Sequence, residues 1–368
     1  MIGARVGLRA RERIAALGAG GLDGRNLRRQ VLEVIREVID FEAYVWMLTD
    51  PITTVGADPL AEVPCLPELP ALIKARYATP VNRWTVLQHR NPPVGLLVKA
   101  VGGELARSLV WREVMSRYRI GDVASVVFAD RFGCWSFLEL WRDDTHRPFD
   151  DDAAGFIAGL TPALTIALRE CQARTFVEPA TSHRRDVGPV VLTLDDDLRI
   201  TSRTAASRDW LDTLLPPVPG ERSVPSSVYN VAAQLLAVED GVDDHAAATR
   251  AHLADGYWLT VRAARLTSDE PDQRVIRQGR ATIVVTIEES SAKERLELFA
   301  RAYCLTPRES ELLGLLATGR DTRAMARQMT LSEHTIQDHL KSIFSKTGSG
   351  DRITVLCRAL GTSHPAKG

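Results

Sequence analysis

The stretches Leu305-Thr306-Pro307-Arg308-Glu309 and Thr335-Ile336-Gln337-Asp338-His339-Leu340-Lys341 decide how the last part of this 368-residue chain folds. In the first stretch Thr306 is a typical helix N-cap, Pro307 falls at the first helical position, and Glu309 can complete a capping box. In the second stretch apolar residues recur at helical spacing, which predicts one face packed on a core and one polar face. Together they predict two helices of a helix-turn-helix.

Another short helix is expected between these two. Asp321 can cap it, and Met325 and Met329 would be buried on its inner face. Ser332 can cap the third helix, which we expect from about residue 333 to residue 345. The stripe that seats this third helix on the other two consists of Ile336, Leu340, Ile343 and Phe344.

The outward face of the third helix carries side chains suited to reading DNA bases. Glutamine can contact adenine through two hydrogen bonds, aspartate can accept from the cytosine amino group, and lysine can reach guanine or a phosphate. These side chains are Gln337, Asp338 and Lys341. Phosphates would repel Asp338 unless a cytosine or a cation compensates for its charge, so a base contact and a local partnership with Lys341 both remain open. The other residues expected to contact DNA, mainly at phosphates, are His334, Thr335, Ser332, Arg323 and Lys346.

Residues 305–360 resemble the LuxR-type DNA-binding domain over its whole length. The resemblance is carried by Leu305-Thr306-Pro307-Arg308-Glu309, Gly319, Ala326, Leu331-Ser332-Glu333, Thr335-Ile336, His339-Leu340, Ile343, Lys346 and Arg352. It implies base contacts from Gln337, Asp338 and Lys341, with Thr335 on the DNA backbone. The last DNA-binding region of a sigma factor shares the opening motif, but the stretch 339–341 and the lack of a recognisable polymerase-binding region argue against it.

The same resemblance implies a fourth helix, from about Arg352 to Leu360, that mediates dimer contact. Its contact residues would be Ile353, Leu356, Cys357 and Leu360. Two copies would then present two recognition helices to an approximately palindromic operator in double-stranded DNA.

Composition and charge agree with a multidomain DNA-binding protein. The chain has 45% apolar and 25% charged residues and a net charge of −1. From Lys293 onward there are 12 Lys+Arg against 8 Asp+Glu, so this part is basic and the remainder is acidic. The five scattered cysteines form no C-x-x-C pair, and no apolar run is long enough to span a membrane. We therefore expect a cytoplasmic protein without a disulfide framework, a metal site or a membrane contact.

The first domain is expected at residues 24–172, after a basic tail or helix at residues 1–23. The expected elements are a helix at 25–39, a strand at 41–48, a hairpin of strands at 124–129 and 134–141, and one closing helix at 151–174. The hairpin followed by Arg147-Pro148-Phe149-Asp150 resembles the end of a GAF domain. This resemblance implies a small-molecule pocket over one face of the sheet.

Five residues of this domain could line or gate such a pocket, or could simply pack the core. They are Trp46, Trp84, Trp111, Trp135 and Arg83. No cysteine or histidine has a context that suggests haem or bilin attachment, so we expect no cofactor.

The second domain is expected at residues 189–290. The expected elements are a strand that ends in an acidic turn at 190–197, a short strand at 198–201, a helix at 204–215, a proline-rich stretch at 216–225, a helix at 227–238, and strands at 256–265 and 281–288. This order resembles a PAS domain. A phosphate-receiver domain would need a lysine after its first acidic turn, and there is none between Val190 and Ala292. The acidic triplet Asp195–Asp197 is read as a solvated turn rather than as a metal site.

The sequence thus predicts an α+β multidomain protein, with GAF-like and PAS-like antiparallel-sheet domains followed by an all-α four-helix LuxR-type domain at residues 304–364. A linker at 173–188 and a helix at 291–303 would connect them. The predicted function is a homodimeric transcription regulator with an unknown small-molecule effector, with RNA polymerase as a possible partner. A constitutive regulator whose upstream domains only dimerise is the alternative. An enzyme is disfavoured because no catalytic motif is found.

Overall fold

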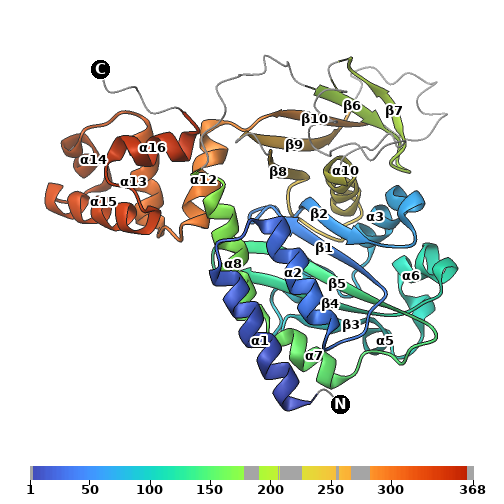
Figure 1. Cartoon of the computed structure of the whole chain (residues 1–368). Coiled ribbons are helices and arrows are strands. Elements are labelled where there is room, and N and C mark those ends of the chain that lie inside the picture. The colour runs from blue at the N-terminus through green and yellow to red at the C-terminus, as the bar shows by residue number, and fades with distance from the viewer. Residues whose placement is uncertain are drawn as a thin grey trace, which may run out of the picture. The chain divides into compact units, whose positions relative to one another are not determined.

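The structure is a computed structural model and describes residues 3–177, 190–205, 207, 226–253, 257–266 and 282–362 (Figure 1). These residues divide into two compact units. The first comprises Met1–Leu168, Val187–Ala251 and Thr260–Glu288, and the second comprises Arg169–Asp186, His252–Leu259 and Glu289–Gly368. Within the described residues, no helix is both long and apolar enough to cross a membrane.

The chain opens with two helices that pack on each other, α1 (Ala4–Ala19) and α2 (Gly24–Arg36). Asp23 starts α2 by accepting hydrogen bonds from the backbone N–H groups of Arg25 and Asn26, each at 2.9 Å. The apolar face of α2 is buried, as its helical spacing predicts. The basic N-terminal stretch is therefore helical from Ala4 to Ala19.

A five-stranded sheet follows. Its strands are β1 (Ala43–Thr49), β2 (Gly56–Glu62), β3 (Val94–Leu96), β4 (Ile120–Asp130) and β5 (Gly133–Asp143). The spatial order is β2-β1-β5-β4-β3, and every neighbouring pair is antiparallel. The expected hairpin is present as β4 and β5, which pair directly across the turn at Asp130–Gly133.

The segment between β2 and β4 covers one face of this sheet with short helices that the sequence analysis did not define. They are η1 (Leu66–Glu68), α3 (Leu69–Ala78), α4 (Trp84–Leu87), α5 (Leu97–Ala100), η2 (Leu105–Arg107), α6 (Leu109–Glu113) and η3 (Met115–Tyr118). Apolar residues of α3, α5, α6 and η3 form one core with Val123 of β4 and Trp141 of β5. This core holds the covering segment on the sheet.

The single closing helix expected at 151–174 is in fact two helices, α7 (Asp151–Ala158) and α8 (Thr161–Arg174). The break has a local cause. Pro162 has no N–H to donate, and its ring would clash with the carbonyl of Ala158 if the helix were continuous. The hydroxyl of Thr161 instead donates to the Ala158 carbonyl at 2.8 Å.

A second five-stranded sheet has the same strand order along the chain. Its strands are β6 (Val190–Leu194), β7 (Ile200–Arg203), β8 (Ala248–His252), β9 (Trp258–Arg265) and β10 (Ile283–Glu289), in the order β7-β6-β10-β9-β8. The helix expected at 227–238 is α10 (Ser226–Glu239). The proline-rich stretch at 216–225 and nearly all of the helix expected at 204–215 lie outside the described residues.

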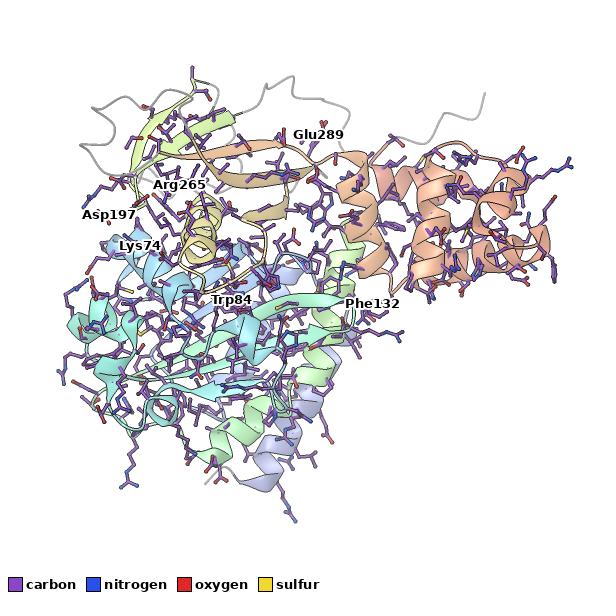
Figure 2. All side chains as sticks on the ribbon, turned by 180° about the vertical axis from the view of Figure 1, so that it is seen from behind. Lys74, Trp84, Phe132, Asp197, Arg265 and Glu289 are labelled. Atoms are coloured by element: carbon purple, nitrogen blue, oxygen red, sulfur yellow. The ribbon has the colours of Figure 1, made fainter. Side chains whose placement is uncertain are left out.

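The acidic triplet after β6 forms a turn with nearby partners. Asp195 accepts from the N–H groups of Asp197 and Arg199, and Asp196 pairs with Arg265 at 2.6 Å. Asp197 pairs with Lys74 of α3 at 2.8 Å, and Figure 2 shows these two side chains next to each other. These contacts fit the reading of the triplet as a turn.

Within the first unit, buried polar contacts join α10 and β8 to the β1–β2 region. The amide of Asn230 donates to the Gly56 carbonyl at 3.0 Å, and the hydroxyl of Thr249 donates to the Val55 carbonyl at 3.1 Å. Arg250 and Asp50 form a buried two-point ion pair with distances of 2.5 and 2.7 Å. These contacts are one reason that both sheets contribute to the same compact unit.

The second unit contains the C-terminal helices α12 (Ala292–Ala302), α13 (Pro307–Ala317), α14 (Thr322–Met329), α15 (Glu333–Thr347) and α16 (Arg352–Leu360). Its core includes an aromatic cluster in which Phe176 stacks on Trp258 and meets Phe299 edge-on, with ring centroids 5.3 Å apart in both pairs. The Tyr303 hydroxyl donates to the Ala173 carbonyl at 2.9 Å. The helix α12 is thereby packed against residues that lie far away in sequence.

Candidate nucleic-acid interface

The helix α13 begins with the expected capping box. The N–H of Glu309 donates to the Thr306 hydroxyl at 3.3 Å, and the N–H of Thr306 donates to the Glu309 carboxylate at 2.7 Å. Pro307 occupies the first turn. Gly319 follows the helix with a φ of +74°, a conformation that glycine adopts at little cost.

The helices α14 and α15 form the two arms of the helix-turn-helix. Asp321 caps α14 by accepting from the N–H of Ala324 at 2.7 Å, and Ser332 caps α15 by accepting from the N–H of Thr335 at 3.1 Å. Between them Thr330 adopts a left-handed φ of +55°. The predicted caps are confirmed, and α15 ends at Thr347 rather than near Ser345.

The helix α15 has the expected inner and outer faces. Ile336, Leu340 and Ile343 are buried, and Phe344 is half-buried. On the outer face His334, Gln337, Asp338 and Lys341 are all exposed. The Gln337 amide has no hydrogen-bond partner among the described residues, so both its donor and its acceptor are available to a base.

The carboxylate of Asp338 lies between two basic side chains of its own helix. Lys341 Nζ is 3.4 Å from one carboxylate oxygen, and His334 Nε2 is 3.6 Å from the other. All three side chains are more than half exposed, so these contacts are weak. Lys341 thus places a cation beside Asp338, and the exposure of these side chains leaves them able to move.

Lys346 is anchored more firmly than the other predicted DNA contacts. Its ammonium donates to the buried carboxylate of Glu309 at 2.6 Å and to the Cys304 carbonyl at 3.3 Å. The hydroxyl of Ser342 donates to the same carboxylate at 2.6 Å. Glu309 thus joins the capping box of α13 to the second half of α15, and it fixes the position of α15.

This environment also lowers the pKa of Glu309. Burial opposes ionisation, but the hydrogen bonds from Lys346, Ser342 and the N–H of Thr306 outweigh it and bring the pKa to about 2. Glu309 is therefore a carboxylate throughout the neutral range.

The remaining predicted phosphate contacts lie at the start of α14 and α15. Arg323 is exposed on α14, and the hydroxyls of Ser332 and Thr335 lie 2.9 Å apart at the start of α15. Arg320 and Arg327 are exposed as well and were not among the predicted contacts. They could have been found from the sequence, because both are basic residues in or beside the second helix of the motif.

The helix α16 matches its predicted bounds and has two different faces. Val355 and Ala359 are fully buried against the other helices. On another face Ile353 is 51% exposed. The other predicted dimer residues, which share the i, i+3, i+4, i+7 spacing with Ile353 and are partly exposed, are Leu356, Cys357 and Leu360.

The side chains considered for an effector pocket are mostly buried in the first unit, and the indole N–H groups of the four candidate tryptophans have partners. Trp46 donates to Ser136 at 2.8 Å, Trp84 to the Thr54 carbonyl at 2.8 Å, Trp111 to the Ile120 carbonyl at 2.7 Å and Trp135 to Asp130 at 3.1 Å. Figure 2 shows Trp84 inside the unit.

The fifth candidate, Arg83, is buried in a polar cluster. It pairs with Asp243 at 2.7 Å and donates to the Gln234 side chain at 3.0 Å. Although burial disfavours ionisation of Asp243, the hydrogen bonds from His245 and the charge of Arg83 hold the pKa of that carboxyl well below its usual range. Each of the five candidates therefore has hydrogen-bond partners within the first unit.

Comparison with known proteins agrees with this geometry. Residues 303–359 match the family of bacterial regulatory proteins described as the luxR family. The chain is 39% identical over 64 residues to a probable HTH-type transcriptional regulator, GfsR, of Streptomyces halstedii. It is 28% identical over 95 residues to the transcriptional regulatory protein DesR of Bacillus subtilis.

These similarities cover limited parts of each protein. They extend over 17% and 26% of this chain, and over 26% of GfsR and 47% of DesR. The match to the luxR family spans α13 to α15 and nearly all of α16, which are the helices that carry the caps and the exposed face described above. Residues 303–359 of this chain therefore form a helix-turn-helix domain of the luxR family.

Proposed function

We propose that this chain is a sequence-specific, DNA-binding transcription regulator that acts as a cytoplasmic homodimer and responds to a small-molecule effector. The observation that carries the proposal is the exposed polar face of α15. The buried carboxylate of Glu309 fixes the position of this helix through Ser342 and Lys346. A helix held in this way presents its side chains to the major groove with a defined register.

On DNA, Gln337 would read adenine and Lys341 would reach guanine or a phosphate. Asp338 would accept from a cytosine amino group, with Lys341 compensating for its charge. Phosphate contacts would come from Ser332, Thr335, Arg323 and, where it leaves Glu309, Lys346. To these we add Arg320 and Arg327.

Dimerisation is proposed through the exposed stripe of α16 that contains Ile353 and Leu360. A two-fold dimer would place two copies of α15 on the half-sites of a palindromic operator. Contact with RNA polymerase would let the dimer activate transcription, whereas binding over a promoter would repress it.

Effector sensing is proposed for the two sheet-bearing regions. The GAF-like assignment of residues 24–172 is supported by the five-stranded antiparallel sheet and its helical cover. The PAS-like assignment of residues 189–290 is supported by the second sheet with the same strand order. An effector that binds one DNA-binding state better than another would shift the protein toward that state.

The test is capture and sequencing of genomic DNA fragments bound by the purified full-length protein. Lys341→Glu reverses a charge on the outer face of α15, and Lys293→Glu makes the same change at an exposed position of α12. We expect a recurring palindrome with the wild type and with Lys293→Glu, and none with Lys341→Glu. Equal enrichment by both variants would contradict the placement of α15 on DNA.

A constitutive regulator is the second candidate, because the five residues first considered for an effector pocket all have hydrogen-bond partners within the first unit. It predicts that operator affinity does not change when cell extract containing small molecules is added. A change in affinity that is lost after dialysis would favour the effector-responsive function.

A further inference from the structure

The side chain of Arg358, on α16, fastens the last turn of α15. Its Nη1 donates to the carbonyls of Thr347 at 2.9 Å and Gly348 at 3.2 Å, and to the hydroxyl of Ser349 at 3.2 Å. Thr347 is the last residue of α15, and the carbonyls of a last helical turn have no partner further along their own helix. Arg358 therefore closes the end of α15 from a different helix.

This contact lies in a partly buried and well-defined environment. Thr347 and Ser349 are only 3% and 8% exposed. Gly348 turns the chain with a left-handed φ of +61°, and the N–H of Ser349 donates to the Phe344 carbonyl at 3.0 Å. The positive charge of Arg358 also complements the negative end of the helix dipole of α15. The end of α15 is thus held against α16 in a defined position.

The helix α16 is itself fixed at both of its ends. At its last turn, the guanidinium of Arg295 donates to the carbonyls of Ala359 at 3.3 Å and Arg358 at 3.5 Å. At its first residue, Arg352 Nη2 donates to the hydroxyl of Thr322, which begins α14, at 2.8 Å. The contact between Arg358 and Thr347 therefore joins α15 to a firmly placed element.

The proposed dimer residues lie on the other side of α16 from Arg358. At about 100° per residue, Arg358 lies roughly 150° around the helix axis from the middle of the stripe formed by Ile353, Leu356, Cys357 and Leu360. In the proposed dimer α16 thus stands between the partner copy and α15.

A small change in the angle between α15 and α16 would move the base-reading side chains by a distance that matters on DNA. Gln337 lies ten residues before Thr347, which is about 15 Å along an α-helix. A tilt of about 10° at Thr347 would move Gln337 by about 3 Å, close to the rise of about 3.4 Å between successive base pairs. In a dimer joined through α16, this angle sets the distance between the two reading helices.

We propose that Arg358 is a positioning residue that determines which spacing between two operator half-sites the dimer accepts. It touches no base and acts through the end of α15. The inference rests on the proposed function, DNA binding by a dimer joined through α16, and adds a residue that determines the spacing of the operator. Without this guanidinium α15 still packs through Ile336 and Leu340, so one half-site is still read while the spacing preference relaxes.

The test measures the affinity of the full-length protein for synthetic duplexes made from the captured palindrome. The half-sites are separated by the natural spacer or by one or two base pairs more or fewer, and one further duplex carries a single half-site. We expect the wild type to prefer the natural spacing at least tenfold. Arg358→Met should reduce this preference at least fivefold and change the affinity for the single half-site less than twofold. A merely structural role would lower all affinities together and leave their ratio unchanged.

Three further variants complete the series, and near-UV circular dichroism verifies the fold of each. Arg358→Lys replaces the planar fork of donors by one ammonium and should restore part of the preference. Ser349→Ala removes one acceptor and should reduce the preference less than Arg358→Met does. Arg308→Met removes an exposed arginine that pairs with Glu311 on α13, and it should leave the ratio unchanged. The wild-type ratio in folded Arg358→Met, or in Ser349→Ala where Arg358→Met does not fold, would overturn the proposal.

Ile353→Glu tests the dimer contact on which the spacing depends. It places a charge in the stripe of α16 and should abolish the spacing preference while a single half-site is still bound. A spacing preference retained in this variant would overturn the inference, because the dimer would then be joined elsewhere. A wild type that binds the palindrome at all spacings equally would also overturn it and would leave the proposed DNA binding intact. Absence of a captured palindrome would contradict the proposed function and the inference together.

Discussion

At the scale of single residues, Glu309 links two helices of the C-terminal domain, α13 and α15. Its carboxylate closes the capping box of α13 and receives Lys346 and Ser342 of α15. The folded-state pKa of about 2 lies below that of an unfolded glutamate, so the charged form stabilises the fold. This stabilisation is present above about pH 4.5 and is lost as the pH falls toward 2.

Glu309→Gln should therefore lower the stability of the C-terminal domain at pH 7 by up to about 3 kcal/mol. The difference from the wild type should shrink between about pH 4.5 and 2, where the wild-type carboxylate becomes protonated. Amide hydrogen exchange of peptides from 305–347, corrected for intrinsic pH dependence, measures it. Glu311→Gln is the control, because its pair with Arg308 is exposed. A difference that does not depend on pH would contradict the role of the charge.

Gln337→Ala should relax discrimination at one base pair of each half-site. The expected loss is about 1–3 kcal/mol, because the amide would otherwise make two hydrogen bonds to one adenine. Competition binding with operators substituted at each position measures it. Unchanged base preference at every position would show that Gln337 does not face the bases.

Lys341→Ala should weaken binding to all sequences and flatten its dependence on salt. A lost phosphate contact reduces the slope of the logarithm of affinity against the logarithm of salt concentration by about 1. Titrations at four salt concentrations measure the slope, and Lys293→Ala on α12 is the control. The same slope in Lys341→Ala and wild type would exclude a phosphate contact and leave only a base contact.

Residue positions differ in how far sequence predicts them. The caps Thr306, Asp321 and Ser332 could be predicted because a cap and its N–H partner lie within three residues. The pair of Glu309 with Lys346 spans 37 residues, and no local pattern shows it. The acid Glu139 within an apolar strand was a signal for a buried ion pair, but its partner Arg76 could only be found in the fold.

At the scale of elements, local patterns predicted long, regular segments and missed irregular ones. The hairpin of β4 and β5 has two apolar, aromatic-rich runs separated by a clear turn, so it was predicted. The strand β2 contains Pro59 and few apolar residues, and it lies at the edge of its sheet, where proline is tolerated. The effect of Pro162 on the helix expected at 151–174 was readable in principle, because proline acts locally.

Arg295 of α12 stabilises the end of α16. The guanidinium is buried, and it donates to the carbonyls of Ala359 at 3.3 Å and Arg358 at 3.5 Å. Burial lowers the pKa of Arg295 to about 10 against the opposing charge of Glu289, so it stays charged at neutral pH. These carbonyls have no partner within their own helix.

Arg295→Met should therefore destabilise α16 by about 1–3 kcal/mol and weaken dimerisation of the full-length protein. Hydrogen exchange of peptides from 352–362 and sedimentation equilibrium measure the two effects. Lys293→Met on the exposed face of α12 should change neither. Unaltered protection of α16 in Arg295→Met would contradict its role as a cap.

At the scale of the whole molecule, the first unit depends on buried charge at the contact between β8 and the turn after β1. Asp50 and Arg250 are fully or nearly fully buried. Replacing one partner leaves the other charge buried without compensation, which typically costs about 3–5 kcal/mol. The domain boundaries predicted from sequence at residues 172 and 189 remain predictions. The pair of Asp50 with Arg250 joins residues 200 positions apart, and no sequence pattern shows it.

Arg250→Met should accordingly lower the free energy of unfolding of the first unit by about 3–5 kcal/mol. Arg262→Met removes an exposed pair with Glu288 and should cost less than about 1 kcal/mol. Urea denaturation of both variants, followed by near-UV circular dichroism, provides the comparison. Equal midpoints for the two variants would mean that the buried pair does not stabilise the unit.

The cluster of Phe176, Trp258 and Phe299 has a consequence for protein engineering. These rings come from three separate stretches of the chain, and all belong to the same unit as the helix-turn-helix. A chimera that joins a foreign sensor at residue 304 would omit this support entirely. A junction before Ser291 would keep Phe299 but would expose it to solvent. A working transplant therefore has to supply substitutes for Phe176 and Trp258, or to replace Phe299 by a polar residue.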